Sequence, residues 1–171
     1  MRYYKFNDDF IFSDGLTYIE ADDGWTLRQL TVGDGQTIAS NVNHPQWGFT
    51  LPEKHVNYDD FEEVIPITQQ EFDTVWNQHL SQHHQQWETA KALYPLGRRV
   101  TGAILVFYPQ GVIIDLESNA LGVADYARCH ASAQPEWMYP KHQVKAVVAG
   151  YDEENQWIKL AEPQVLAQTT E

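Results

Sequence analysis

The strongest strand pattern of this chain lies in TGAILVFYPQGVIIDLESNALGVADY, residues 101–126. This stretch holds three runs rich in β-branched and aromatic residues, at 102–108, 112–118 and 120–124, with turn residues between them. Two further runs follow at 143–151 and 156–162, and a polar turn, DEEN, joins them as a hairpin. Apolar residues alternate with other residues along the last two runs, so each strand has an inner and an outer face.

The spacing of these five runs predicts a small closed barrel. A long connection, 125–142, separates the third run from the fourth, and glycines stand where the strands have to bend. Five strands with such an excursion fit the partly open five-stranded barrel called the OB-fold.

Residues 1–66 predict a small antiparallel β meander of three or four strands followed by a long loop. Turn signals such as Asp14-Gly15 and Gly33-Asp34-Gly35 separate strand-like runs. In the run 25–32, simple alternation places Thr26, Arg28 and Leu30 on one face. The proline-rich loop then leads to a short strand near Val64-Ile65.

Residues 67–97 predict one long linking helix. Thr68 and Glu71 form a T-x-x-E capping box, and apolar residues then recur at three- and four-residue spacing as far as Leu93. The predicted fold class is therefore mainly β, of the α+β type. Its parts are a β module at 1–66, the helix at 67–97 and the barrel at 98–171.

Composition and charge limit the range of possible functions. The 171 residues carry a net charge of −13, and residues 1–97 contribute −10 of it, with 15 acidic and 5 basic residues. An acidic surface repels phosphate at long range, which argues against non-specific nucleic-acid binding by the whole chain but leaves room for a local basic patch. The alternative is that the charge only keeps the protein soluble.

The sequence predicts a cytoplasmic protein with no membrane association. The single cysteine, Cys129, excludes an intramolecular disulfide and is typical of a reducing compartment. The first residues contain no apolar run of the kind a signal peptide needs, and no apolar stretch approaches the roughly 20 residues of a membrane helix.

Residues 98–162 resemble the S1 RNA-binding domain, an OB-fold module. The family motifs G-x-V-x-x-I, F-G-A-F-V-x-L, G-L-V-H-I-S, V-x-V-x-x-I-D and I-x-L-S match, in order, Gly102–Phe107, Gln110–Leu116, Gly122–Ala127, Val144–Asp152 and Ile158–Leu160. The resemblance implies that the chain binds RNA or single-stranded nucleic acid. The family stacks bases on two aromatic residues and a histidine. Gln110, Ile113 and Asp125 stand at those positions here, as expected if the barrel is kept as a scaffold.

Other residues offer replacements for the missing ligand contacts. Aromatic residues expected to be exposed are Tyr108, Tyr126 and Trp157. Cations that can contact phosphate are Arg128, Lys145 and Lys159, together with Arg98 and Arg99. The alternative for each is structural: the aromatic residues pack into the protein, and the lysines are solvated strand positions.

The segment YIEADDGWTLRQLTVGDGQ, residues 18–36, is similar over a short stretch to a poorly characterised bacterial module. That module has the pattern Y-x-E-x-D-x-D-G-x-x-x-R-Q and is sometimes associated with toxin-immunity settings. The similarity implies an alternative function, an acidic adaptor-like or immunity-like module that binds a protein partner and uses the barrel only as a scaffold.

Nothing in the sequence predicts catalysis. Adjacent acids such as Asp59-Asp60 occur in turn segments, and no nucleophile or base lies in a recognisable motif. His79 and His83 have the i, i+4 spacing of helical metal ligands but lack the glutamate of H-E-x-x-H, so a solvated helix face is expected. We therefore expect a non-catalytic protein with no catalytic residues, no cofactor and no metal.

Overall fold

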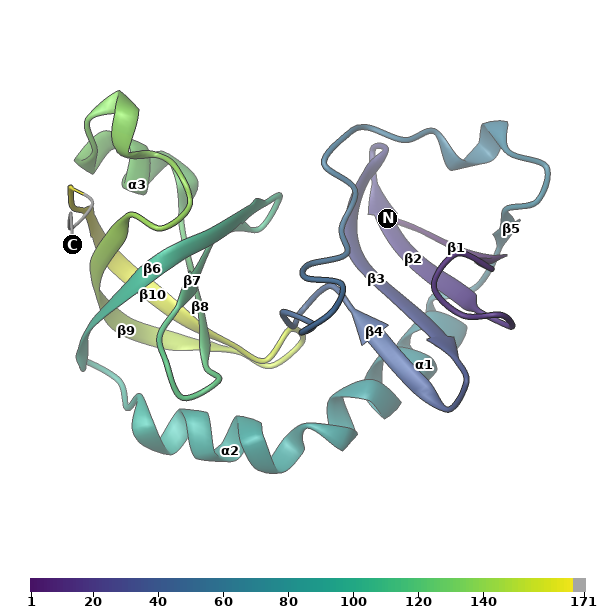
Figure 1. Ribbon diagram of the computed structural model, residues 1–171, viewed down its shortest axis with the longest axis horizontal. Coiled ribbons are helices and arrows are strands. Elements are labelled where there is room, and N and C mark those ends of the chain that lie inside the picture. The colour runs from purple at the N-terminus through teal and green to yellow at the C-terminus, as the bar shows by residue number, and fades with distance from the viewer. Residues whose placement is uncertain (168–171) are drawn as a thin grey trace. The chain divides into compact units, whose positions relative to one another are not determined.

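The computed structural model describes residues 1–167 and divides into two compact units (Figure 1). The first unit is Met1–Gln82, and the second begins at His83. Residues 168–171, the end of the predicted barrel segment, lie outside the described residues. No helix within the described residues is long and apolar enough to cross a membrane.

The first unit is a five-stranded antiparallel sheet with the strand order β4-β3-β2-β1-β5. Its strands are β1 (Arg2–Asn7), β2 (Leu16–Asp22), β3 (Trp25–Gly33), β4 (Gln36–Ala39) and β5 (Ile65–Pro66). The predicted meander is confirmed as β1 to β4. The short strand expected near Val64-Ile65 is β5, which pairs with β1 at the sheet edge.

Both faces of this sheet are covered. Helix α1 (Gln69–Gln82) buries Phe72 and Trp76 against Leu30 and Ala39 on one face. On the opposite face, the connection between β4 and β5 packs Tyr58, at the start of a 3-10 turn η1 (Tyr58–Asp60), against Tyr4, Ile19 and Ala21. The long proline-rich loop is therefore an ordered second layer.

The single helix predicted for residues 67–97 is two helices, α1 and α2 (His84–Leu93), with a break at His83. The φ and ψ angles of His83, −107° and 7°, depart from helical values. α1 packs on the first unit's sheet, whereas Trp87 and Ala90 of α2 belong to the core of the second unit. No proline or glycine marks the break, so packing on two separate cores overrides the local pattern.

The second unit is a closed barrel with the strand order β10-β8-β7-β6-β9. Its elements are β6 (Arg99–Tyr108), β7 (Gly111–Asp115), β8 (Leu121–Ala124), α3 (Tyr126–Ser132), a 3-10 turn η2 (Pro135–Trp137), β9 (Gln143–Asp152) and β10 (Trp157–Val165). Neighbouring strands are antiparallel except β8 and β10, which are parallel, and β6 closes the barrel against β9. The five predicted strands are confirmed. α3 and η2 lie within the predicted long connection.

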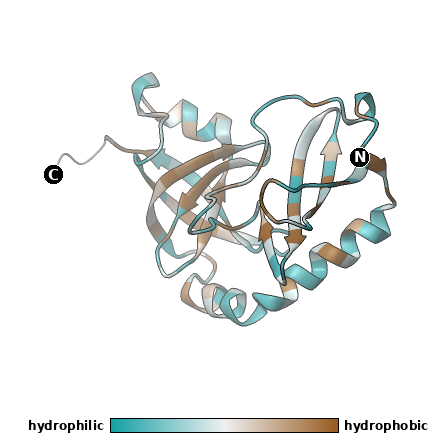
Figure 2. Cartoon of the chain, turned by 45° about the vertical axis from the view of Figure 1, so that its right-hand side comes forward, coloured by the Kyte–Doolittle hydropathy of each residue, from teal (hydrophilic) through white to brown (hydrophobic). Residues whose placement is uncertain are grey.

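The barrel core explains why these residues form strands. Ile104 of β6 pairs with Ile114 of β7, and Gly122 of β8 lies between Ile114 and Ile158 of β10. The three isoleucines are fully buried, and hydrophobic residues run along the barrel strands (Figure 2). Gly111 has a φ of 144°, and a Cβ there would clash with the carbonyl oxygen of Ala124, so this tight turn requires glycine.

Candidate nucleic-acid interface

A shallow groove lies on the outside of the barrel where β6, β9 and β10 meet. Val100 and Ala146 point into the core, so their strand neighbours Arg99, Thr101 and Lys145 point outward. The groove has a volume of about 450 Å³. Its lining includes Arg99, Thr101, Lys145, Val147, Glu162 and Gln164.

A β-bulge shapes one wall of this groove. The pairing of β10 with β9 shifts register between Ala161 and Gln164. Within the bulge, Glu162 has a φ of 51°, in the left-handed region that non-glycine residues rarely adopt. Bulges of this kind bend a strand and redirect its side chains, and they often lie beside functional sites.

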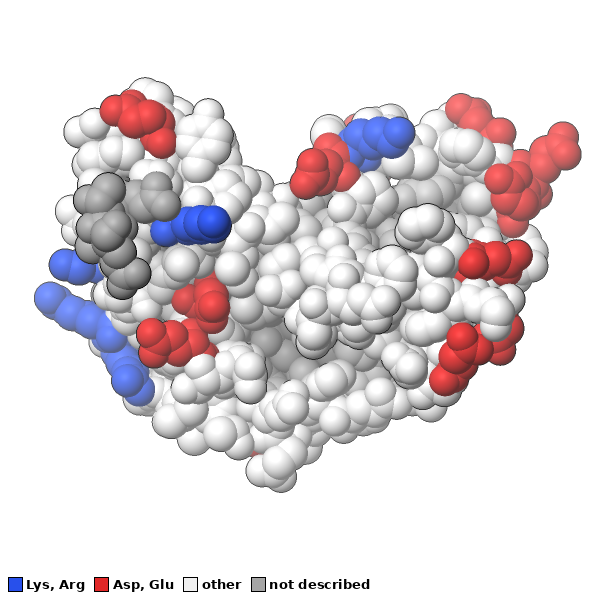
Figure 3. All heavy atoms as spheres, in the orientation of Figure 1, with Lys and Arg blue, Asp and Glu red and all other residues white. Residues whose placement is uncertain are grey.

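The groove holds two cations, Arg99 and Lys145, and one carboxylate, Glu162. Across residues 1–167, neither Arg99 nor Lys145 forms an ion pair. On the strands of the first unit, by contrast, each cation contacts an acid, in the pairs Arg2–Asp59, Lys5–Glu71 and Arg28–Glu20. Figure 3 shows Asp and Glu side chains on both units, gathered mainly at the right-hand side of the first unit, and several Lys and Arg side chains on the barrel unit. The groove thus carries a small net positive charge on an acidic protein.

Three predicted ligand residues are buried. Ile113 lies between Val112 and Ile114 of the barrel core, so it faces the opposite side of β7, and it is fully buried as well. The rings of Tyr108 and Trp157 are in contact, with centroids 6.1 Å apart, and burial raises the pKa of the Tyr108 hydroxyl. The expectation that Tyr108 and Trp157 are exposed is therefore wrong, because their rings pack instead.

Asp125 and Gln110 stand at structural positions, a helix cap and a tight turn. Asp125 is exposed, but it caps α3: its Oδ1 accepts the backbone N–H of Arg128 at 2.8 Å. Gln110 is half-buried in the turn between β6 and β7. Asp125 thus has a local structural role that the resemblance to the S1 domain did not indicate.

The remaining predicted residues are accessible. Lys159 lies on the outer face of β10, next to Gly150 and Val123 of the neighbouring strands. Arg128 is exposed on α3, and Tyr126 is 50% exposed on the same helix. Tyr126 contacts two rings that sequence reasoning missed, Phe107 and His130. The i, i+4 spacing of Tyr126 and His130 was the available signal.

The two histidines lie in different surroundings. His79 is 2% exposed in the first unit, where its Nε2–H donates to Oδ1 of Asn41 at 2.8 Å. His83 lies at the helix break and contacts Gln86. The expected solvated helix face is therefore wrong for His79. Across residues 1–167, no three His, Cys, Asp or Glu residues are grouped as metal ligands.

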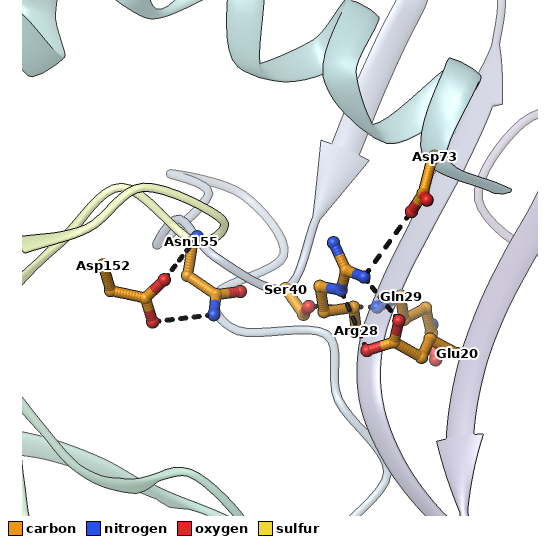
Figure 4. Close-up of polar contacts among 7 residues, drawn as sticks. All are labelled: Glu20, Arg28, Gln29, Ser40, Asp73, Asp152 and Asn155. Atoms are coloured by element: carbon orange, nitrogen blue, oxygen red, sulfur yellow. Dashed lines mark hydrogen bonds and ion pairs between the residues drawn. The ribbon is translucent and has the colours of Figure 1, made fainter. Parts of the chain in front are cut away.

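A buried ion pair that no sequence pattern indicated lies beneath α1 (Figure 4). Nε of Arg28 donates to Oε1 of Glu20 at 2.9 Å, and Asp73 of α1 lies 3.7 Å from the same guanidinium. The guanidinium also lies over the rings of Phe72 and Trp76, with its central carbon 5.0 and 5.2 Å from their centroids. This cluster fastens α1 to the sheet.

Two further contacts in Figure 4 are local. The Gln29 backbone N–H donates to Ser40 in the first unit, and Asp152 accepts two hydrogen bonds from Asn155 in the β9–β10 turn. These bonds hold loops in place.

In comparisons with known proteins, the chain matches no family model and no curated protein.

Proposed function

We propose that the second unit is an S1-like OB-fold barrel that binds single-stranded nucleic acid, RNA in particular, without catalysing a reaction. Its strand order supports this assignment. Numbered along the chain, the strands follow each other around the barrel as 1-2-3-5-4, the third and fifth are parallel, and a helix lies between the third and fourth. OB-folds are five-stranded Greek-key barrels that bind oligonucleotides.

The observation that carries the proposal is the groove with Arg99 and Lys145. These residues are diagonal neighbours across β6 and β9, because Thr101 pairs with Lys145 and Arg99 pairs with Val147. Diagonal positions are about 7–8 Å apart, which lets the two long side chains contact neighbouring phosphates. Thr101 and Gln164 add hydroxyl and amide groups of the kind that bind phosphate and sugar oxygens.

The acidic character of the chain sets the expected binding behaviour. With a net charge of −13, long-range attraction of nucleic acid is absent, so binding depends on contacts within the groove. Neutralising phosphates releases counterions, and each contact with a single strand adds about 0.7 to the slope of log affinity against log salt. Affinity therefore falls as salt rises.

The test measures fluorescence anisotropy of labelled single-stranded RNA at about 50 mM salt, with protein at micromolar concentration, and repeats it as salt rises. The variant Arg99→Gln/Lys145→Gln is expected to weaken binding and to flatten the salt slope by about 1.4, for two lost phosphate contacts. Lys141→Gln is the matched control, because Lys141 is exposed in the same unit but does not line the groove. Absence of binding by the unsubstituted protein, or an unchanged slope in the double variant, contradicts the proposal.

A second candidate function rests on the first unit. Phe61 and Ile65 are 47% and 53% exposed, and they stand in an acidic segment with Asp60, Glu62 and Glu63. Exposed aromatic and aliphatic side chains between charges are typical of protein-binding surfaces. We propose this surface as the contact site for a basic protein partner if the barrel acts only as a scaffold.

Its test is charge reversal of Asp60, Glu62 and Glu63 combined with co-purification of a basic partner. Asp59 stays unchanged, because it forms an ion pair with Arg2 and accepts a hydrogen bond from Tyr4 at 3.1 Å. Loss of the partner in the reversed variant supports this function. A monomer from which no partner is recovered contradicts it.

A further inference from the structure

We propose that Tyr126, together with His130 and Phe107, forms a platform on which a nucleic-acid base stacks. This inference rests on the proposed function of the barrel and assigns one part of it to α3. The platform is separate from the phosphate contacts of the groove. It adds contact with a base where Arg99 and Lys145 contact only the backbone.

Tyr126 contacts two other rings and remains half exposed. His130 lies roughly parallel to Tyr126, at 24° and with centroids 6.1 Å apart, and Phe107 meets Tyr126 edge-to-face at 5.9 Å. Aromatic rings prefer these offset and edge-to-face arrangements. Half of the Tyr126 surface remains exposed, so a base can extend the stack on its open side.

Helix α3 holds the platform in a fixed position. Asp125 caps the start of the helix, Cys129 is buried in the barrel core, and Oγ of Ser132 accepts the backbone N–H of Val165 at 3.1 Å. A ring on an anchored helix loses little freedom when a base binds, which favours affinity. Val165 directly follows Gln164, so the end of α3 adjoins the groove.

Helical periodicity separates the rings from the nearby cation. At 100° per residue, Tyr126 and His130 lie on one flank of α3 relative to the buried Cys129, and Arg128 lies on the other. The platform therefore consists of rings alone, and Arg128 lies outside it. Every base has a π face, so stacking there is expected to show little sequence preference.

The experiment compares binding of oligothymidine with that of an abasic oligomer of the same length, because stacking requires the base. Stacking is worth about 1–3 kcal/mol per base, or about 5- to 150-fold in affinity. Tyr126→Ala is expected to weaken oligothymidine binding about tenfold while leaving the abasic oligomer unaffected. Tyr126→Phe keeps the ring and is expected to bind as the unsubstituted protein does.

Tyr139→Ala is the matched control, because Tyr139 is 61% exposed in the same unit and makes no ring contact with any residue in the described chain. Equal losses on the two oligomers in Tyr126→Ala, or no loss on either, would overturn the platform. Failure of the unsubstituted protein to bind any oligomer would instead overturn the proposed function of the barrel. The two failures are therefore distinguishable.

Discussion

Arg28 shows what a single residue does beneath α1. Its guanidinium is nearly buried, forms a two-pronged pair with Glu20 on the neighbouring strand, and lies over the rings of Phe72 and Trp76. Burying two charges is costly, so such a pair stabilises the fold only while both partners are present. These contacts fix how α1 packs on the sheet.

Replacing only Arg28 is therefore expected to destabilise the fold strongly. Arg28→Met leaves Glu20 buried without its main cation and is predicted to lower the free energy of unfolding by about 3–5 kcal/mol in urea titrations. The double variant Glu20→Gln/Arg28→Met removes both charges and is predicted to be less destabilised than Arg28→Met. A double variant as unstable as the sum of the two single variants would show that the charges act independently.

Cys129 is predicted to make the stability of the fold depend on pH. Burial, followed by the nearby Asp125 carboxylate, raises the pKa of its thiol from about 9 to about 11. The folded state thus holds the proton more tightly than the unfolded state. The contribution to stability is present in full below pH 9 and is lost as pH rises toward 11.

At pH 8 the Cys129 thiol is expected to react with a thiol reagent only as fast as the protein opens, and rapidly in denaturant. The measurement is the rate of modification with and without urea. Immediate stoichiometric modification of the folded protein would contradict the burial of this thiol.

At the scale of elements, Asp125 is predicted to act on the stability of α3. Asp125→Ala removes the cap and is expected to lower the free energy of unfolding by about 1 kcal/mol, whereas Asp125→Asn keeps an acceptor and costs less. Chemical denaturation measures both. Affinity for single-stranded RNA is expected to stay within twofold in Asp125→Asn, and a large loss there would instead assign Asp125 to the ligand site.

The sequence predicted elements well where a local pattern determines them. Runs of β-branched and aromatic residues between turn signals located all five barrel strands. The Thr68 cap was confirmed by the Glu71 N–H, which donates to Oγ1 of Thr68 at 3.2 Å, whereas the Glu71 carboxylate contacts Lys5. The break at His83 was missed, because packing on two cores causes it. Simple alternation placed Thr26 and Arg28 on one face, but a β-bulge at Glu20/Ala21 turns Thr26 toward Tyr58 and Arg28 toward α1.

The candidate site was predictable only in part for a similar reason. Arg99 and Lys145 are far apart in sequence and meet only through the register of β6 with β9. Tyr108 and Trp157 pack against each other, which no local pattern reveals. The exposure of a side chain depends on the whole fold. The sequence alone therefore cannot show which aromatic or basic residues are accessible to a ligand.

At the scale of the whole molecule, each unit has its own core. Trp76 is fully buried between α1 and the sheet, whereas the barrel core is built around Ile104, Ile114 and Ile158. Trp76→Ala is predicted to destabilise the first unit by about 3–5 kcal/mol and to lower hydrogen-exchange protection there. Amides of the barrel strands are expected to keep their protection. Equal loss across the chain would show that the units unfold together.

The central claim is that the groove of Arg99 and Lys145 binds single-stranded nucleic acid. The most direct test is a titration of the isotope-labelled protein with a single-stranded RNA oligomer, followed by amide chemical shifts in NMR spectra. The shifts are predicted to concentrate at 99–101, at 145–147 and at Glu162 and Gln164, which line the groove, and on α3. Shifts confined to the first unit around Phe61, or no shifts at low salt, would contradict it.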